Sequence, residues 1–326
     1  MTKESNTRNV KKAVILAGGF GTRFLPATLA LAKELFPIGN KPILMYHLDD
    51  LIKAGITEVL IIGNTFKESS FENFLNPDEK LLDKIESHGN NIYLEEYRSL
   101  FNKVKITYVN QDAKVLDFGG VCKENDLIEK HGSSIAVYIA KDWAAGEPFI
   151  VLNGDDLCIY EDGRSISKEV IDVFNATGDM VIYGKEMPRE QIYKYSSMKL
   201  GEVTDESTGA IKISDIVEKP PTGTEPSNFM GFARYLFTSE VFDKIDESKP
   251  RQNGEFCITD VVQSFAREGK VSTVIFDGTY YDCGSMAGYV LANTHFGLKN
   301  ESSANQVLEG INKFTKDAEW NCEKMF

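Results

Sequence analysis

A glycine-rich segment near the start of the chain contains residue types that bind phosphate groups. Its sequence is Ala17-Gly18-Gly19-Phe20-Gly21-Thr22-Arg23, and Lys33 follows it. Because glycine has no side chain and tolerates positive φ angles, several backbone N–H groups of such a loop can approach one anion. Arginine adds a planar fork of donors, and lysine adds a compact point charge. The segment therefore predicts a loop that binds a ligand with several negative charges, as a triphosphate has.

This segment differs from two better-known glycine-rich loops. A dinucleotide-binding fingerprint requires a glycine three residues after Gly21, where Phe24 stands. A P-loop requires Gly-Lys followed by Ser or Thr, whereas Thr22 and Arg23 follow Gly21. On glycine spacing alone an ordinary turn between a strand and a helix is the alternative, and the charges of Arg23 and Lys33 argue against it.

Paired carboxylates form the second candidate group. Asn153-Gly154-Asp155-Asp156 directly follows the apolar run 148–152. Adjacent side chains of an extended chain point in different directions, so we expect one of the two carboxylates, Asp155, to face a bound ion. Mg²⁺ binds through one or two carboxylates and completes its shell with water and substrate oxygens. Asp282 is the candidate second ligand, and the alternative is a turn in which an aspartate caps the backbone.

Two further positions stand where predicted strands end. Val217-Glu218-Lys219-Pro220 closes one strand with an acid beside a base, so that Lys219 could hold a second phosphate and Glu218 a hydroxyl-rich partner. The alternative is a solvated ion pair at a sheet edge. Gln111 follows the alternating run 104–109 and is a candidate ligand contact, because open α/β sheets bind ligands beyond the carboxyl ends of their strands.

The elements that must position these residues alternate along the chain in the manner of an α/β protein. Short apolar runs predict strands and longer periodic runs predict helices. Predicted strands are 13–16, 58–63, 104–109, 148–152, 180–183, 200–203, 211–218 and 232–237. Predicted helices are 42–55, several within 66–101, and 133–143, 239–245, 259–267 and 286–298.

Composition limits the kinds of partner. The 326 residues carry a formal net charge of −13, which argues against a broad electrostatic contact with nucleic acid or an anionic membrane. Five scattered cysteines show no paired spacing and are interpreted as reduced thiols. No signal peptide and no apolar run long enough to span a bilayer is evident, so we expect a cytoplasmic protein. We expect a flexible N-terminus at 1–10, one catalytic domain at 11–298 with an insertion or flap at 112–131, and a helical tail at 299–326.

Together these motifs resemble those of the sugar-nucleotide pyrophosphorylases, and among them the bacterial UTP–glucose-1-phosphate uridylyltransferases. The resemblance covers roughly residues 11–298. It is carried by the following motifs: the glycine-rich segment 17–23, Leu25-Pro26-Ala27-Thr28, Lys33-Glu34-Leu35-Phe36-Pro37, Val217-Glu218-Lys219-Pro220 and Asp282-Cys283-Gly284.

The resemblance implies an α/β, Rossmann-like, glycosyltransferase-A-type nucleotidyltransferase fold with a mixed, mostly parallel central sheet flanked by helices. It implies that UTP and α-D-glucose 1-phosphate give UDP-glucose and pyrophosphate, by in-line attack of the sugar phosphate on the α-phosphate with Mg²⁺. It also implies a homodimer or homotetramer with the C-terminal helices as contacts. The implied catalytic residues are Arg23, Lys33, Asp155 and Lys219; the nucleotide contacts are Ala17, Gly18, Gly19, Gly21, Thr22, Gln111 and Gly132; the sugar contacts are Gly201, Glu218, Asn228 and Glu255; the metal ligands are Asp155 and Asp282.

The chain departs from the family pattern at three places. The base-binding Gly-x-Gly-His-Ala-Val corresponds to residues 132–137, in which Ser134 replaces a glycine. The sugar-side Tyr-Gly is matched with Leu200-Gly201, and Ala233 stands in place of the glycine before an Arg-Tyr pair. These departures leave two alternatives: a pyrophosphorylase of the same fold that uses another nucleotide or sugar, and a non-catalytic regulatory protein that binds nucleotide sugars.

Overall fold

The longest apolar runs of the sequence form the centre of one sheet. The computed structural model describes residues 8–89, 91–113 and 132–316, and within these residues nine strands form a sheet of order β5-β4-β1-β6-β11-β8-β12-β10-β9. The strands are β1 (Lys12–Leu16), β4 (Glu58–Gly63), β5 (Lys105–Asn110), β6 (Phe149–Asn153), β8 (Met180–Glu186), β9 (Ser196–Asp205), β10 (Ala210–Glu218), β11 (Phe229–Phe237) and β12 (Val271–Ile275). Two short ladders, β7 (Asp156–Ile159) with β13 (Thr279–Asp282) and β2 (Pro37–Ile38) with β3 (Lys41–Pro42), lie outside it.

The sheet is mixed, as predicted, but its parallel part is smaller than predicted. Strands β5, β4, β1 and β6 pair in parallel, and so do β8 and β12. The other neighbours pair antiparallel, so the two kinds of pairing are about equally common among the described strands. The sequence prediction missed β12, because Val-Ser-Thr-Val-Ile is short and half polar, and it also missed helix α7 (Ile166–Thr177).

Helices cover both faces of the sheet, and alternate residues of β1 show which helices cover which face. Ile15 packs with α1 (Ile43–Lys53) and α7 on one face, whereas Val14 packs with α5 (Ser133–Ile139), α8 (Glu240–Glu247) and α9 (Ile258–Arg267) on the other. Both side chains are fully buried, as expected for a parallel strand covered on two sides. The predicted helix at 133–143 is divided, because α6 (Lys141–Ala144) follows α5.

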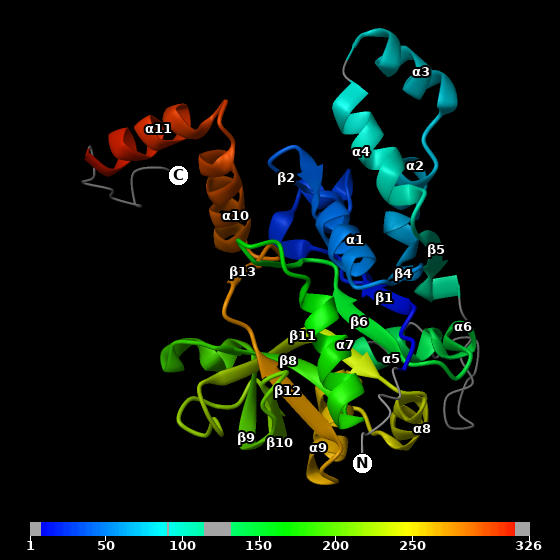
Figure 1. Cartoon of the computed structure of the whole chain (residues 1–326), viewed down its shortest axis with the longest axis vertical. Helices are drawn as coiled ribbons and strands as arrows, with labels where there is room; N and C mark the ends of the chain where they lie inside the picture. Colours follow the sequence, from blue (N-terminus) through cyan, green and yellow to red (C-terminus); the bar gives the residue numbers. More distant parts are fainter. Residues whose placement is uncertain (1–7, 90, 114–131, 317–326) are drawn as a thin grey trace.

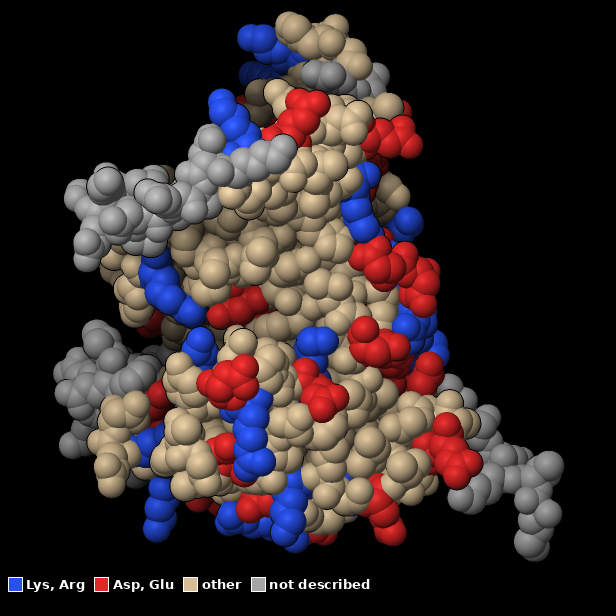
Figure 2. Space-filling model, turned by 90° about the vertical axis from the view of Figure 1, so that its left-hand side faces the viewer, with Lys and Arg blue, Asp and Glu red and all other residues tan. Residues whose placement is uncertain are grey.

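Two groups of helices extend beyond the sheet (Figure 1). The first is α2 (Glu68–Leu75), α3 (Glu79–Ser87) and α4 (Asn91–Phe101), which rise above the β4–β5 end. The second is α10 (Met286–Lys299) and α11 (Ala304–Lys316), which project on the opposite side. Figure 2 faces that side and shows Lys, Arg, Asp and Glu interspersed over its lower half, while a broad area of the upper half carries no charged side chain.

Two other expectations concern the insertion and the lack of a membrane-spanning segment. Of the insertion expected at 112–131, only residues 112 and 113 lie within the described chain, in a short 3₁₀ turn after β5. No helix among the described residues is long and apolar enough to cross a membrane.

The start of α7 is held by a residue of another helix. Asp50 of α1 accepts hydrogen bonds from Ser165 Oγ and the Ile166 N–H, both at 2.8 Å, and from Ser167 Oγ at 2.5 Å. The Nε atom of the buried Arg234 lies 3.4 Å from the Asp50 carboxylate. Asp50 thus satisfies a helix N-terminus and balances a buried cation at the same time.

We predict that Asp50→Ala lowers the free energy of unfolding by about 3–5 kcal/mol, because it leaves Arg234 buried without its counter-ion. Asp49→Ala is the matched control, since Asp49 lies next to Asp50 but forms an exposed ion pair with Lys53 at 2.8 Å. The control should cost less than about 1 kcal/mol. Urea unfolding of both variants measures the difference. Equal decreases in the free energy of unfolding would show that Asp50 does not stabilise the buried Arg234.

Candidate functional site

A cleft of about 740 Å³ lies beyond the carboxyl end of β6 and brings together residues from distant parts of the sequence. Six of the predicted site residues line it: Arg23, Asp155, Glu218, Lys219, Glu255 and Asp282. Sequence reasoning did not select several other lining residues, which include Asp156, Lys194, Tyr195, Ser196, Thr259 and Tyr280. The cleft therefore contains three cationic side chains, Arg23, Lys194 and Lys219, although the whole protein is acidic.

The glycine-rich segment leaves β1 and folds back on itself beside this cleft. Gly21 has a φ of 68°, and its carbonyl accepts a hydrogen bond from Thr28 Oγ1 at 3.1 Å. The side chain of Gln111 lies directly over Gly18, where a Cβ atom would come within 2.4 Å of Gln111 Oε1. Glycine at position 18 therefore lets the loop and Gln111 approach each other, which brings together two of the predicted nucleotide contacts.

A buried ion pair holds the first residues of this loop. Lys67 Nζ donates to the Ala17 carbonyl at 2.7 Å and to both carboxylate oxygens of Glu34 at 2.9 Å. Asn64 Nδ2 donates to the Gly18 carbonyl at 2.8 Å. Burial raises the pKa of Glu34 and lowers that of Lys67, and the charge of each partner opposes the shift of the other. Lys67 and Asn64 were not predicted, because nothing in the sequence near them marks a contact with residues 17 and 18.

The second buried ion pair joins Lys33 to Asp155. Lys33 Nζ contacts Asp155 Oδ2, and both side chains are about 15% exposed or less. Burial opposes the charge of Asp155, but Lys33 outweighs it and lowers the pKa of that carboxyl. The structure thus pairs Lys33 with a candidate metal carboxylate, and its role in binding the triphosphate stays a prediction.

Asp155 and Asp282 converge on one glycine. A Cβ atom on Gly284 would lie 2.2 Å from Asp155 Oδ2 and 3.0 Å from Asp282 Oδ1, so glycine at this position lets both carboxylates approach the same point of the backbone. Burial and the charge of Asp155 raise the pKa of Asp282, and Arg23 Nη1 lies 3.7 Å from Asp282 Oδ2. Two hard oxygen donors that converge in the lining of a cleft fit a divalent cation that takes its other ligands from water and substrate. Among the described residues, no group of three or more His, Cys, Asp or Glu side chains is placed to hold a metal ion.

Asp156 has different partners from Asp155, as the prediction for adjacent carboxylates required. Tyr280 donates to Asp156 Oδ1 at 2.7 Å, and Asn153 Nδ2 donates to Oδ2 at 2.8 Å. Burial, together with the neighbouring charge of Asp155, raises the pKa of Asp156 to about 7. Asp156 is thus held by hydrogen bonds to the wall of the cleft.

The opposite end of the cleft contains the predicted Glu218 and Lys219. Thr259 Oγ1 donates to Glu218 Oε2 at 2.9 Å, which orients this carboxylate. Lys219 has a φ of 47°, and its side chain is 66% exposed, with Nζ 3.7 Å from Glu218 Oε1. Gly132 lies near Glu255, because a Cβ at Gly132 would meet Glu255 Cγ at 2.9 Å and the Phe256 carbonyl at 2.3 Å.

Two predicted sugar contacts do not line the cleft. Gly201 lies in the middle of β9, where a Cβ would face the Lys212 carbonyl at 3.1 Å, and Asn228 donates to Glu186 at 2.9 Å. The residues of this region that line the cleft are Tyr195 and Ser196, at the start of β9. Matching Leu200-Gly201 with the family's Tyr-Gly was therefore wrong, because strand β9 begins earlier than the sequence indicated and carries Gly201 away from the cleft.

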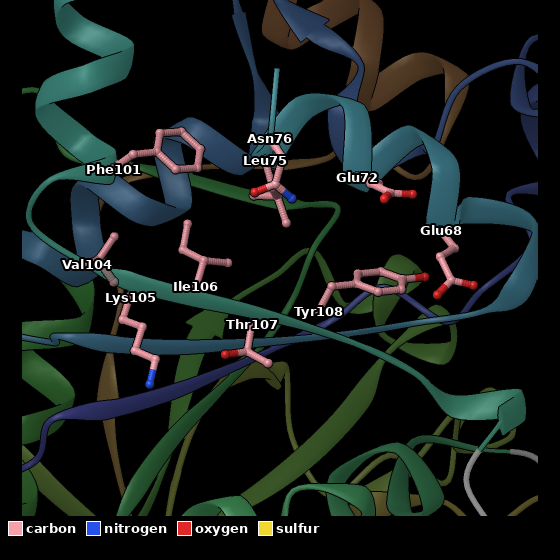
Figure 3. A pocket seen from close by; sticks show the side chains of 10 residues that line it. All are labelled: Glu68, Glu72, Leu75, Asn76, Phe101, Val104, Lys105, Ile106, Thr107 and Tyr108. Atoms are coloured by element: carbon pink, nitrogen blue, oxygen red, sulfur yellow. The ribbon is translucent and has the colours of Figure 1, made fainter. Parts of the chain in front are cut away.

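A second hollow of about 690 Å³ lies along β5 and lacks these features (Figure 3). Its lining includes the apolar side chains of Leu75, Phe101 and Ile106, with Glu68 and Glu72 on α2. Lys105 is the one cationic residue among the described residues that line it, and no predicted site residue does so. The 740 Å³ cleft is therefore the candidate site.

Comparisons with known proteins agree with this fold. The family model described as nucleotidyl transferase matches residues 12–297. The chain is 31% identical to a UTP–glucose-1-phosphate uridylyltransferase from Pseudomonas aeruginosa, over 89% of this chain and 97% of that protein. It is 32% identical to UTP–glucose-1-phosphate uridylyltransferase 2 from Staphylococcus saprophyticus, over 94% of this chain and 98% of that one. A crystal structure of UDP-glucose pyrophosphorylase complexed with UDP-glucose has a TM-score of 0.76 at 29% identity and covers 90% of this chain and 100% of its own.

We predict that Glu34→Gln and Lys67→Met each lower the free energy of unfolding by about 3–5 kcal/mol, because each leaves a buried charge unpaired. The double variant should lose clearly less than the sum of the two single losses. Lys53→Met, which removes an exposed lysine, is the control and should change stability by less than about 1 kcal/mol. Additive single losses in urea unfolding would contradict a direct interaction between the two charges.

Proposed function

The chain belongs to the nucleotidyl transferase family, and from that premise we propose that it is the enzyme that joins UTP and α-D-glucose 1-phosphate to give UDP-glucose and pyrophosphate. The observation that carries the proposal is the convergence of Asp155 and Asp282 at one side of a cleft that also contains Arg23 and Lys219. The names of the curated relatives support the choice of UTP and glucose 1-phosphate.

The chemistry needs positioning and charge neutralisation more than it needs a protein nucleophile. A phosphate oxygen of the sugar attacks the α-phosphorus of UTP in line, and pyrophosphate leaves from the opposite side. The attacking group is itself an anion, so no side chain has to remove a proton. Arg23 is proposed to bind phosphate oxygens of the nucleotide, and Lys219 to bind the sugar phosphate; the proposal is supported by their exposure, since both side chains line the cleft and are about two-thirds exposed. Lys33 keeps Asp155 ionised.

Mg²⁺ is proposed as the cofactor, held by Asp155 and Asp282. When bound, the ion would neutralise negative charge on the phosphates. The convergence of both carboxylates on Gly284 supports this assignment. Gly284 also donates its N–H to Asp282 Oδ1 at 3.0 Å, which orients that carboxylate.

The nucleotide and the sugar are assigned to different groups of residues in and beside the cleft. Gln111 with the Ala17-Gly18 backbone is proposed to bind the uracil, supported by the close contact of Gln111 with Gly18. Gly19, Gly21, Thr22 and Gly132 remain proposed nucleotide contacts. Glu218 and Glu255 are proposed to bind the sugar, together with Ser196, which replaces the Gly201 of the sequence prediction.

Ser196 also supports an alternative within the same family. Its Oγ donates to the Gly231 carbonyl at 2.6 Å inside the cleft, so a hydroxyl stands at the sugar end of the site. A different sugar 1-phosphate, or a different nucleotide, is the second candidate. A non-catalytic regulatory role is less well supported, since the protein has both candidate metal carboxylates.

Assembly and location also remain proposals. A homodimer or homotetramer is supported by the apolar side chains that α10 exposes, namely Met286, Val290 and Leu291, each more than half exposed. A cytoplasmic location is supported by the described cysteines Cys158, Cys257 and Cys283, which are free thiols.

We predict pyrophosphate release from UTP and glucose 1-phosphate in the presence of Mg²⁺, at a higher kcat/KM than with any other pair in a panel of nucleotides and sugar 1-phosphates. Higher activity with another pair would establish the alternative, and no turnover with any pair would refute an enzymatic role.

Asp155→Asn should lower kcat by about 10²-fold or more with a smaller effect on the KM for UTP, because it removes charge stabilisation from the transition state. Asp49→Asn, at an exposed position, is the control.

We predict that Gly284→Ala raises the Mg²⁺ concentration for half-maximal activity by about 10–100-fold, because the added methyl group would collide with Asp155 Oδ2 and displace that carboxylate. Gly310→Ala is the matched control, since no heavy atom lies within 4 Å of a Cβ built there. A Gly284→Ala enzyme with the Mg²⁺ requirement of the unaltered protein would contradict the proposed metal position.

A further inference from the structure

A buried arginine lies behind the candidate site without a complete set of partners. Arg234 on β11 is 1% exposed, and within the described chain its Nε and Nη1 atoms have no hydrogen-bond partner. Its counter-ion Asp50, 3.4 Å away, already accepts four hydrogen bonds from the start of α7. Burying a guanidinium with two unpaired nitrogens lowers the stability of the protein. The remaining nitrogen, Nη2, makes the contact that could offset this cost.

That contact fixes the protonation of a buried histidine. Arg234 Nη2 lies 3.3 Å from His47 Nδ1. A guanidinium has donors only, so His47 Nδ1 must be the acceptor. Burial and the charge of Arg234 lower the pKa of His47 to about 3, and the ring is therefore neutral near pH 7. A neutral ring that accepts at Nδ1 carries its hydrogen on Nε2, and this N–H donates to the Gly154 carbonyl at 3.2 Å.

Gly154 is the residue directly before Asp155, and it is held on several sides. Its N–H donates to the Leu16 carbonyl at 2.9 Å, at the end of β1. A Cβ at Gly154 would lie 2.5 Å from Glu34 Cγ, so the backbone lies directly against that side chain. The hydrogen bond from His47 fixes the remaining polar group of this residue. A rotation of the peptide between Gly154 and Asp155 would break that bond and redirect the Asp155 side chain.

We propose that His47, held in a single tautomer by Arg234, is a positioning residue that fixes the Gly154 carbonyl and thereby the direction of the Asp155 carboxylate. His47 is buried and acts through the backbone, and neither it nor Arg234 lines the cleft as the structure describes it. The consequence for metal binding rests on the proposed function, whereas the tautomer and the orientation of Asp155 do not depend on it.

Two substitutions of His47 separate its two hydrogen bonds. His47→Asn keeps an acceptor near the position of Nδ1 but is too short to donate to Gly154, whereas His47→Gln keeps a donor at the reach of Nε2. We expect His47→Asn to raise the dissociation constant for Mn²⁺, measured by electron paramagnetic resonance with UTP present, by about 10–100-fold. His47→Gln should restore it to within about threefold. His88→Asn, at an exposed position directly after the end of α3, is the matched control and should have no effect.

Two readouts decide the proposal independently of activity. Nitrogen-15 NMR of the unaltered protein should show His47 as the Nε2–H tautomer from pH 6 to pH 8, and Arg234→Met should allow the other tautomer to appear. A crystal structure of His47→Asn should show Asp155 displaced and that of His47→Gln should not. An Nδ1–H tautomer in the unaltered protein, or Asp155 unmoved in His47→Asn, would overturn the proposal.

The metal measurement separates failure of this inference from failure of the proposed function. If the unaltered protein and Asp155→Asn bind Mn²⁺ equally, the proposed metal site is wrong, and the NMR and crystallographic results still decide the role of His47. If His47→Asn loses stability in urea but binds Mn²⁺ like the unaltered protein, the role of His47 is structural only and the positioning role is refuted.

Discussion

Alternating buried charges beneath the glycine-rich loop are the constraint on which the rest of the site depends. Lys67 pairs with Glu34, and Lys33, the residue directly before Glu34, pairs with Asp155. The first pair also binds the Ala17 carbonyl, so it fixes the nucleotide end, while the second fixes a candidate metal ligand. Since isolated buried charges are strongly unfavourable, none of the four can be altered without affecting the others. The two ion pairs therefore fix the position of the glycine-rich loop relative to the Asp155 carboxylate, in addition to the pairing of the strands that precede them.

Sequence reasoning located six residues that line the cleft, in part because strand ends are informative. Asp155 and Glu218 both stand where an apolar strand gives way to polar residues, and such ends meet at one edge of an α/β sheet. Arg23 and Asp282 were recognised from motifs. The fold class was confirmed by the family match, although the sheet has more antiparallel pairing than expected.

The residues that sequence reasoning missed act through long-range contacts. Lys67 and His47 donate hydrogen bonds to the backbone of site residues, and Arg234 contacts His47. Each of these contacts joins residues that are far apart in the sequence, so no local sequence pattern predicts them. Gly201 was wrongly placed for a related reason. Its position depends on where β9 begins, and strand boundaries are set by pairing with β10 and β11 rather than by the local sequence.

The pairing of β7 with β13 has a consequence for how the protein is made. Asp156 and Asp282 are opposite each other in this ladder, and Asp155 directly precedes β7, so the two candidate metal carboxylates are separated by most of the second half of the chain. A nascent chain that has left the ribosome as far as β6 can already form β1, β4 and the loop that they support. It gains the second carboxylate only when β13 emerges, and such late contacts form slowly because a long loop must close. During synthesis the nucleotide end of the cleft can thus be built well before the protein is competent for turnover.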